Sequence, residues 1–223
     1  GSQVSSFGSI DKTFQVLSDL IKTLEKKNIP IRSINVGGGL PVDHETAGNS
    51  LLSDGISGMD AVLEQAAGFW KKCIQKYFDC TRMNIMIEPG RSIIAHSGIL
   101  LTKVAYRKSN NKKEFLIVDA GMNDFIRPAL YGAVHGIVPL KKPGKSRTTI
   151  DIAGPLCETG DFFARDISFP ESGKGDILAI LSTGAYGFVL SSNYNLRLRP
   201  PELLIDNGEV TCIRERENYE DII

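Results

Sequence analysis

The chain changes its hydrophobic pattern once, and this change limits the folds that it can adopt. In its first part, apolar residues recur at three- and four-residue spacing over 11–28 and 59–77, which predicts two helices with one buried face each. Each helix is followed by a short apolar run, 31–36 and 84–88, that ends in a turn with glycine. Alternation of helix and strand is typical of α/β folds.

After about residue 98 the pattern is that of strands without long helices between them. Turn signals rich in Asn, Gly and Pro separate these strands. The predicted strands are 99–107, 114–119, 148–153, 176–182, 202–205 and 209–213. We therefore predict an α/β domain over residues 1–97 and a mostly β domain over residues 98–223.

The first domain contains only two helix–strand units. A parallel sheet of that size leaves its edges and faces uncovered. A complete α/β barrel needs eight such units, so we expect that the upstream units are cut off or supplied by another chain.

Composition argues against several kinds of partner. Lys+Arg and Asp+Glu both number 26, so the overall charge favours neither nucleic acid nor an anionic membrane. No apolar run approaches the roughly 20 residues of a membrane span, and no signal peptide is recognisable. The four cysteines form no CxxC pair, which favours a reduced, cytoplasmic setting without disulfides. The three histidines lack metal-ligand spacing, so we predict no metal site.

Two groups of residues at the ends of predicted strands could hold an anion. The triplet Gly37-Gly38-Gly39 would let backbone N–H groups approach a phosphate, although such a triplet is more often a simple tight turn. The run from Glu88 to Arg91 places an acid, a glycine and a planar cation at one strand end. Arg91 could hold a carboxylate or phosphate through two N–H groups, or pair with Glu88 and stabilise the turn.

Three polar segments in the second domain could also carry chemistry. Arg127 and Tyr131 are four residues apart and would share a face of a helical turn, or belong to a solvated turn. Cys157 stands beside Glu158 in a glycine-rich stretch, where it could shuttle a proton or be a small buried hydrophobe. Tyr186 lies between glycines, where its hydroxyl could face a ligand or the segment could be an ordinary turn.

Read in order, five motifs of this chain resemble those of the diaminopimelate decarboxylase family. They are Asn35-Val-Gly-Gly-Gly-Leu, Glu88-Pro-Gly-Arg, Asp119-Ala-Gly-Met-Asn-Asp with Arg127-Pro-Ala-Leu-Tyr, Gly154-Pro-Leu-Cys-Glu-Thr-Gly-Asp, and Gly184-Ala-Tyr-Gly with Ser192-Asn-Tyr-Asn. The start Gly1-Ser2-Gln3 resembles the end of the family's His-Ile-Gly-Ser-Gln element. The resemblance extends over nearly the whole chain.

This resemblance implies a fold-type III enzyme that uses pyridoxal 5'-phosphate. Its fold would be a partial (β/α)8 TIM barrel of the alanine-racemase type, followed by a C-terminal β-barrel or β-sandwich domain. The enzyme would work as a cytoplasmic homodimer with shared active sites. It would decarboxylate meso-diaminopimelate to L-lysine and carbon dioxide, the last step of lysine biosynthesis.

The resemblance also implies a role for individual residues around the cofactor. Those that would surround its phosphate are Ser2, Gly37, Gly38, Gly39, Gly90, Arg91 and Tyr186. Glu88 would pair with the pyridine nitrogen and keep it protonated.

Further roles concern the substrate. The substrate-binding residues would be Arg91, Arg127, Tyr131, Glu158 and Tyr186. Among them Glu158 would contact the distal ammonium group. Cys157 would be catalytic and return a proton to the α-carbon, and it would do so in the active site of the partner subunit.

One departure and two alternatives accompany this interpretation. No segment resembles the family's Tyr-x-x-Lys-Ala element with its Schiff-base lysine, so we expect an N-terminally truncated chain that is inactive alone. The alternatives are a decarboxylase of the same fold for ornithine, arginine or carboxynorspermidine, and a non-catalytic homologue. Arg127 and Tyr131 favour diaminopimelate, because a cationic clamp suits a distal carboxylate. Cys157, Glu158 and Tyr186 argue against a pure binding module, which would not need them.

Overall fold

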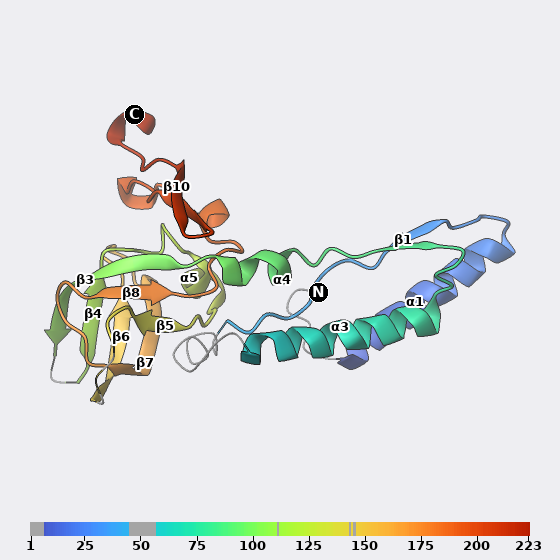
Figure 1. Ribbon diagram of the computed structural model, residues 1–223, viewed down its shortest axis with the longest axis horizontal. Coiled ribbons are helices and arrows are strands. Elements are labelled where there is room, and N and C mark those ends of the chain that lie inside the picture. The colour runs from blue at the N-terminus through green and yellow to red at the C-terminus, as the bar shows by residue number, and fades with distance from the viewer. Residues whose placement is uncertain (1–6, 45–56, 111, 143, 145) are drawn as a thin grey trace. The chain divides into compact units, whose positions relative to one another are not determined.

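The computed structural model describes residues 7–44, 57–110, 112–142, 144 and 146–223 (Figure 1). The chain divides into two compact units, Gly1–His96 and Ser97–Ile223. Each unit has a hydrophobic core of its own.

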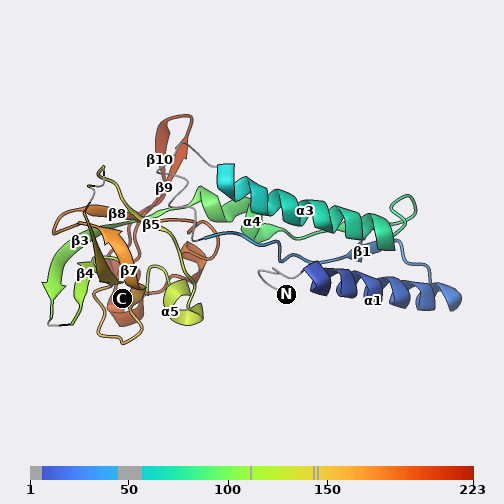
Figure 2. The ribbon, with the colours of Figure 1, turned by 90° about the horizontal axis from the view of Figure 1, so that it is seen from below.

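The first unit combines two long helices with two short parallel strands. Helices α1 (Phe7–Lys26) and α3 (Ser57–Tyr77) run side by side (Figures 1 and 2). Strands β1 (Ser33–Asn35) and β2 (Asn84–Met86) pair in parallel, which is possible because α3 carries the chain back between them. The short helices α4 (Gly90–Ile94) and η1 (Ala95–Ser97) follow β2. The predicted alternation of helix and strand is confirmed.

Aromatic side chains from α1 and the region of α3 form the core of this unit. The ring of Phe14, which is 2% exposed, lies 5.6 Å from Trp70 edge-to-face and 5.7 Å from Phe78. At the rim, Asp11 accepts hydrogen bonds from Lys76 Nζ and from the Tyr77 hydroxyl, both at 3.0 Å. Ser18 Oγ also donates to the Tyr77 carbonyl at 3.1 Å, so the two helices are joined by apolar packing and by several polar contacts.

The second unit contains a six-stranded sheet and a separate hairpin. The sheet strands are β3 (Leu100–Ser109), β4 (Glu114–Val118), β5 (Ile137–Pro139), β6 (Arg147–Ala153), β7 (Phe162–Pro170) and β8 (Ile177–Ile180). Their order is β5-β8-β3-β4-β6-β7, antiparallel except for the pair β4 and β6. The hairpin consists of β9 (Glu202–Asp206) and β10 (Glu209–Arg214). The short helices are α5 (Arg127–Tyr131), η2 (Phe188–Leu190), η3 (Tyr194–Leu196) and η4 (Tyr219–Asp221).

One apolar core serves the whole six-stranded sheet. Strand β8 contributes Leu178 and Ile180, the central strands contribute Val104 and Leu116, and β6 contributes Ile152, all at most 1% exposed. Strands near both ends of the strand order thus contribute to the same apolar cluster. The sheet therefore curves around this cluster (Figure 1). The prediction of a mostly β second part is confirmed.

Two sheet strands were not predicted from the sequence. Strand β5 has only three residues and ends in proline. Strand β7 has nine residues, but its pairing with β6 shifts register twice and Asp166 has a φ of +52°. These irregularities break the two-residue alternation by which a strand is recognised in a sequence. Within the described residues, no helix is long and apolar enough to cross a membrane.

Candidate functional site

The glycine turn after β1 is the first candidate site. Gly37 and Gly39 have φ values of +78° and +95°, in the left-handed region that favours glycine. A Cβ added to Gly38 would lie 2.1 Å from the carbonyl oxygen of Glu88, so no side chain fits there. The turn is therefore bare backbone at three successive positions, as in turns that bind phosphate through their N–H groups.

Asn35, at the end of β1, ties this turn to Glu88. Its side-chain Nδ2 donates to Glu88 Oε1 at 2.6 Å, and its Oδ1 accepts from the Gly37 N–H at 2.8 Å. The Glu88 N–H in turn donates to the Gly37 carbonyl at 2.8 Å. The carboxylate and the glycine turn are thus held as one rigid group. We assigned Asn35 no role from the sequence, although it stands directly before the glycine motif.

Gly90 and Arg91 form the first turn of α4. The helix follows Pro89, which provides no side-chain cap. The first N–H groups of a helix can donate to an external acceptor, and Gly90 and Arg91 occupy these positions in α4. Ser2, also expected near the phosphate, lies outside the described residues.

In the second unit, Asp161 supports the loop that carries Cys157 and Glu158. Its side chain is 2% exposed and accepts backbone N–H bonds from Met122 at 2.6 Å and from Leu156 at 2.7 Å. A Cβ on Gly154 would lie 2.3 Å from this carboxylate, so glycine is required for the close approach. Burial raises the pKa of Asp161, although the two N–H donors oppose the shift.

Cys157 and Glu158 are exposed on the loop that Asp161 supports. Of the two alternatives that the sequence left for Cys157, the structure excludes a small buried hydrophobe. The carboxylate of Glu158 accepts a hydrogen bond from the hydroxyl of Tyr194, and this bond raises the pKa of that phenol. Tyr194 belongs to the Ser-Asn-Tyr-Asn motif, but the sequence alone did not indicate its contact with Glu158.

Arg127 and Tyr131 both lie in α5, as the predicted helical turn requires, but their side chains have different surroundings. Arg127 is 6% exposed, and its Nη1 donates to Nε2 of His135 at 2.8 Å. The other ring nitrogen of His135 donates to the Leu181 carbonyl at 2.8 Å, which leaves Nε2 as the acceptor. Tyr131 is 66% exposed. The two residues thus stand four apart on one helical turn and differ in burial: Arg127 is buried and Tyr131 is exposed to solvent.

Tyr186 occupies a tight turn after β8. It has a φ of +61°, which is unusual for a residue with a side chain. The next residue must be glycine, since a Cβ on Gly187 would lie 2.2 Å from the Thr183 carbonyl oxygen. The turn leaves Tyr186 43% exposed, as a ligand-facing hydroxyl requires.

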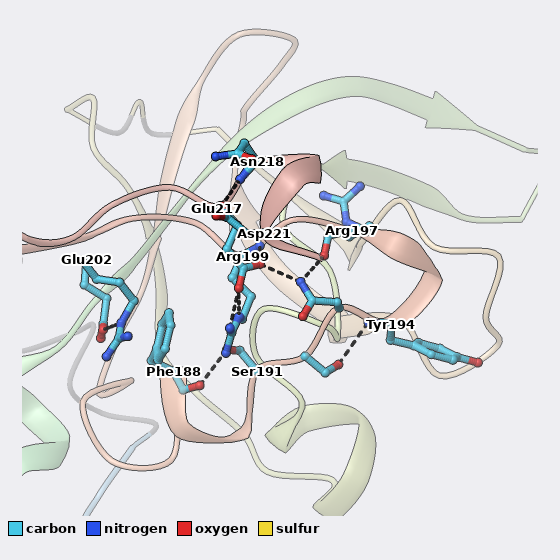
Figure 3. Close-up of polar contacts among 12 residues, drawn as sticks. Phe188, Ser191, Tyr194, Arg197, Arg199, Glu202, Glu217, Asn218 and Asp221 are labelled. Carbon is cyan, nitrogen blue, oxygen red and sulfur yellow. Dashed lines mark hydrogen bonds and ion pairs between the residues drawn. The ribbon is translucent and has the colours of Figure 1, made fainter. Parts of the chain in front are cut away.

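A polar clasp joins the last part of the chain to residues 193–199 (Figure 3). Glu217 Oε2 accepts from Asn193 Nδ2 at 2.6 Å and from the Arg199 N–H at 2.8 Å. Its Oε1 accepts from Arg199 Nε at 2.5 Å. The bonds from the Arg199 side chain and backbone, followed by that from Asn193, lower the pKa of Glu217 to about 2.

We expect replacement of Glu217 by glutamine to reduce the free energy of unfolding by about 2 kcal/mol at pH 7, since charge-assisted hydrogen bonds are lost. A carboxyl group with a lowered pKa stabilises the fold fully above its unfolded value, here 4.5. The difference between wild type and Glu217→Gln should therefore shrink as the pH falls from 4.5 towards 2. Urea denaturation at a series of pH values measures it. Glu215→Gln, an exposed neighbour, is the control; a difference that stays constant down to pH 2 would contradict this expectation.

Among the residues that the structure describes, no group of three or more His, Cys, Asp or Glu side chains is placed to hold a metal ion. The donor sets found instead are a bare glycine turn with Glu88, and a loop with a thiol and a carboxylate. The first suits a phosphorylated, nitrogen-containing ligand, and the second suits proton transfer and cation binding.

Comparisons with known proteins point to one family. The family model described as pyridoxal-dependent decarboxylase, C-terminal sheet domain, matches residues 14–184. Diaminopimelate decarboxylases of Aquifex aeolicus and Campylobacter jejuni are 39% and 38% identical over the whole chain, which covers 50% and 52% of their lengths. The chain thus spans about half the length of the curated relatives that it matches.

Solved structures extend the comparison. A diaminopimelate decarboxylase from Helicobacter pylori complexed with L-lysine has a TM-score of 0.82 and 37% identity, over 100% of this chain and 51% of that one. A lysine/ornithine decarboxylase from Vibrio vulnificus has a TM-score of 0.73 over 89% of this chain and 51% of that one. Its identity is 17%, so it shows a shared fold only.

Proposed function

Because this chain belongs to the family of pyridoxal-dependent decarboxylases, with their C-terminal sheet domain, we propose that the whole protein converts meso-diaminopimelate to L-lysine and carbon dioxide. The observation that carries the proposal is the identity of 38–39% to diaminopimelate decarboxylases over the whole chain. A simple diamine precursor is the weaker candidate, because the cationic Arg127 suits a distal carboxylate.

The glycine turn and Glu88 fit a pyridoxal phosphate ligand. The turn has no room for a side chain at Gly38, and α4 begins with the N–H groups of Gly90 and Arg91. These donors, with Ser2 and Tyr186, would hold the phosphate, and Glu88 would pair with the pyridine nitrogen. When bound, the cofactor supplies an electron sink for the bond that loses carbon dioxide. Asn35, which is hydrogen-bonded to both Glu88 and Gly37, would fix the orientation of the Glu88 carboxylate relative to the glycine turn.

Replacing Asn35 by alanine is expected to weaken pyridoxal phosphate binding about tenfold, because Glu88 and Gly37 lose one partner each. Equilibrium titration of the whole protein, followed by cofactor absorbance, measures the dissociation constant. Asn110→Ala, a change in a loop of the second unit, is the control. Equal affinities for the wild type and Asn35→Ala would exclude a positioning role for Asn35.

The polar groups of the second unit fit the two ends of the proposed substrate. Arg127 and Tyr131, with Arg91, would bind the distal carboxylate. The guanidinium of Arg127 is always charged, and His135 Nε2 accepts one of its hydrogen bonds. Glu158 would bind the distal ammonium. The Sγ–H of Cys157 would deliver a proton to the α-carbon after carbon dioxide leaves, and solvent would then reprotonate the thiolate.

The proposal extends to the assembly and to the barrel of the whole protein. Strands β1 and β2 with α1 and α3 would form two of the eight units of a (β/α)8 barrel, which other residues of the whole protein would complete. Two subunits would share their active sites, each providing Cys157 and Glu158 to the other. The four cysteines are free thiols, which supports a reducing, cytoplasmic setting.

A decarboxylation assay on the whole protein loaded with pyridoxal phosphate tests the function. We expect carbon dioxide and L-lysine from meso-diaminopimelate, and turnover at least 100-fold lower with ornithine, arginine or carboxynorspermidine, since these lack a distal carboxylate for Arg127. Faster turnover of one of these amines would assign the protein to that substrate instead. No turnover of any of them, with the cofactor bound, would support a non-catalytic homologue.

A further inference from the structure

We infer that Tyr194 is a positioning residue for Glu158, and that it thereby contributes to the preference for a substrate with a distal ammonium group. The inference rests on the proposed function, in which Glu158 binds that ammonium. It adds a residue to which neither the motif comparison nor the composition gave a role.

The contact between the two side chains is direct. The Tyr194 hydroxyl donates to Glu158 Oε1. Glu158 is exposed on its loop, where a free glutamate side chain would sample several rotamers. A hydrogen bond to Oε1 restricts the carboxylate and fixes the direction of Oε2. A carboxylate held in this way loses less conformational entropy when it binds a cation.

The turn that carries Tyr194 is itself held at both ends. On one side, the Asn193 side chain donates to the Arg197 carbonyl at 3.0 Å and to Glu217 at 2.6 Å. On the other side, Arg197 Nε donates to Asn123 at 3.1 Å, and its Nη2 donates to the Asp119 carbonyl at 2.6 Å. The ring of Tyr194 points away from this clasp (Figure 3). The surrounding network thus fixes the backbone and leaves the phenol to reach Glu158.

The backbone inside the turn is strained. Asn195 and Leu196 have φ values of +56° and +54°, and two successive non-glycine residues rarely adopt this region. Such a conformation persists only where neighbouring contacts enforce it. Here the bonds of Asn193 and Arg197 flank the two strained residues. If the turn relaxed, the Tyr194 hydroxyl would move away from Glu158. The enforced backbone conformation therefore supports a defined position for this hydroxyl.

Substrate comparison with Tyr194→Phe tests the inference. The whole protein, loaded with pyridoxal phosphate, is assayed for KM and kcat with meso-diaminopimelate, and for the inhibition constant of D-2-aminopimelate, which keeps the distal carboxylate but lacks the distal amine. We expect the KM for diaminopimelate to rise about tenfold with kcat little changed, since one hydrogen bond to a charged group is lost. The inhibition constant of D-2-aminopimelate should stay within twofold.

A double-mutant cycle links the effect to Glu158. Glu158→Gln should raise the KM for diaminopimelate by itself, and adding Tyr194→Phe to it should cause no further rise, because both changes act through one carboxylate. Tyr106→Phe, the same change at an exposed position of β3, serves as the control and should behave as wild type.

Three results would overturn the inference. These are an unchanged KM in Tyr194→Phe, an equal weakening for diaminopimelate and D-2-aminopimelate, and additive effects in the double variant. The proposed function fails in a different way, namely when the wild-type protein with bound cofactor does not decarboxylate diaminopimelate.

Discussion

Cys157→Ala is expected to lower the kcat for meso-diaminopimelate by about 10²- to 10⁴-fold, the usual contribution of a well-placed general acid, with little change in KM. The thiol is exposed at the tip of a loop whose base is fixed by Asp161. Because Cys157 is exposed, its replacement by alanine removes no buried contact. The methyl group of alanine cannot donate a proton. Steady-state kinetics of the whole protein with bound pyridoxal phosphate measure the effect.

Two cysteines offer matched controls. Cys80 and Cys212 are exposed and free like Cys157, and their replacement by alanine should leave kcat unchanged. Cys157→Ser, which keeps a weaker proton donor, should retain more activity than Cys157→Ala. If kcat of Cys157→Ala stays within twofold of wild type, another group delivers the proton.

Asp161→Asn is expected to lower the free energy of unfolding by about 2–4 kcal/mol. The carboxylate now gives the partly buried N–H groups of Met122 and Leu156 one acceptor oxygen each, whereas the amide has only one oxygen. The new amide nitrogen would face one of these donors and leave it unsatisfied. The loop with Cys157 and Glu158 would also lose its support, so kcat should fall. Urea denaturation, followed by far-ultraviolet circular dichroism, gives the stability difference.

An exposed carboxylate provides the control for this change. Asp206→Asn, in the exposed hairpin, should alter stability by less than about 0.5 kcal/mol. Equal stability of wild type and Asp161→Asn would mean that the loops of Met122 and Leu156 do not depend on the Asp161 carboxylate for their stability.

The long helices and most strands were predictable because each follows a local rule. The period of 3.6 residues in α1 and α3, and the turn signals around β3, β4 and β6, are readable within a few residues. Strand β7 was not predicted because its bulged pairing with β6 removes the two-residue alternation of buried and exposed side chains. Its place in the sheet is determined by contacts with β6, which local sequence does not contain.

The candidate site residues also fall into two groups, those predictable from the sequence and those seen only in the structure. Glycine, acid, thiol and arginine motifs were visible because the residues with proposed chemical roles stand next to one another in the chain. The residues that hold them act across large sequence separations: Asn35 on Glu88, and Tyr194 on Glu158. Asp161 binds Met122 N–H in another loop. Such partners are defined only by the fold, since their residue types are common on any protein surface.

The order of the strands also has a consequence for biosynthesis. Strand β3 can form a hairpin with β4 as soon as both are made, but its other neighbour is β8, Ile177–Ile180. The sheet therefore cannot be completed on the ribosome until that later segment has emerged. Glu217, which holds the turn of Tyr194, is synthesised later still. Nascent chains released before this point would have a formed sheet but an unanchored turn at Tyr194, and would be substrates for quality control.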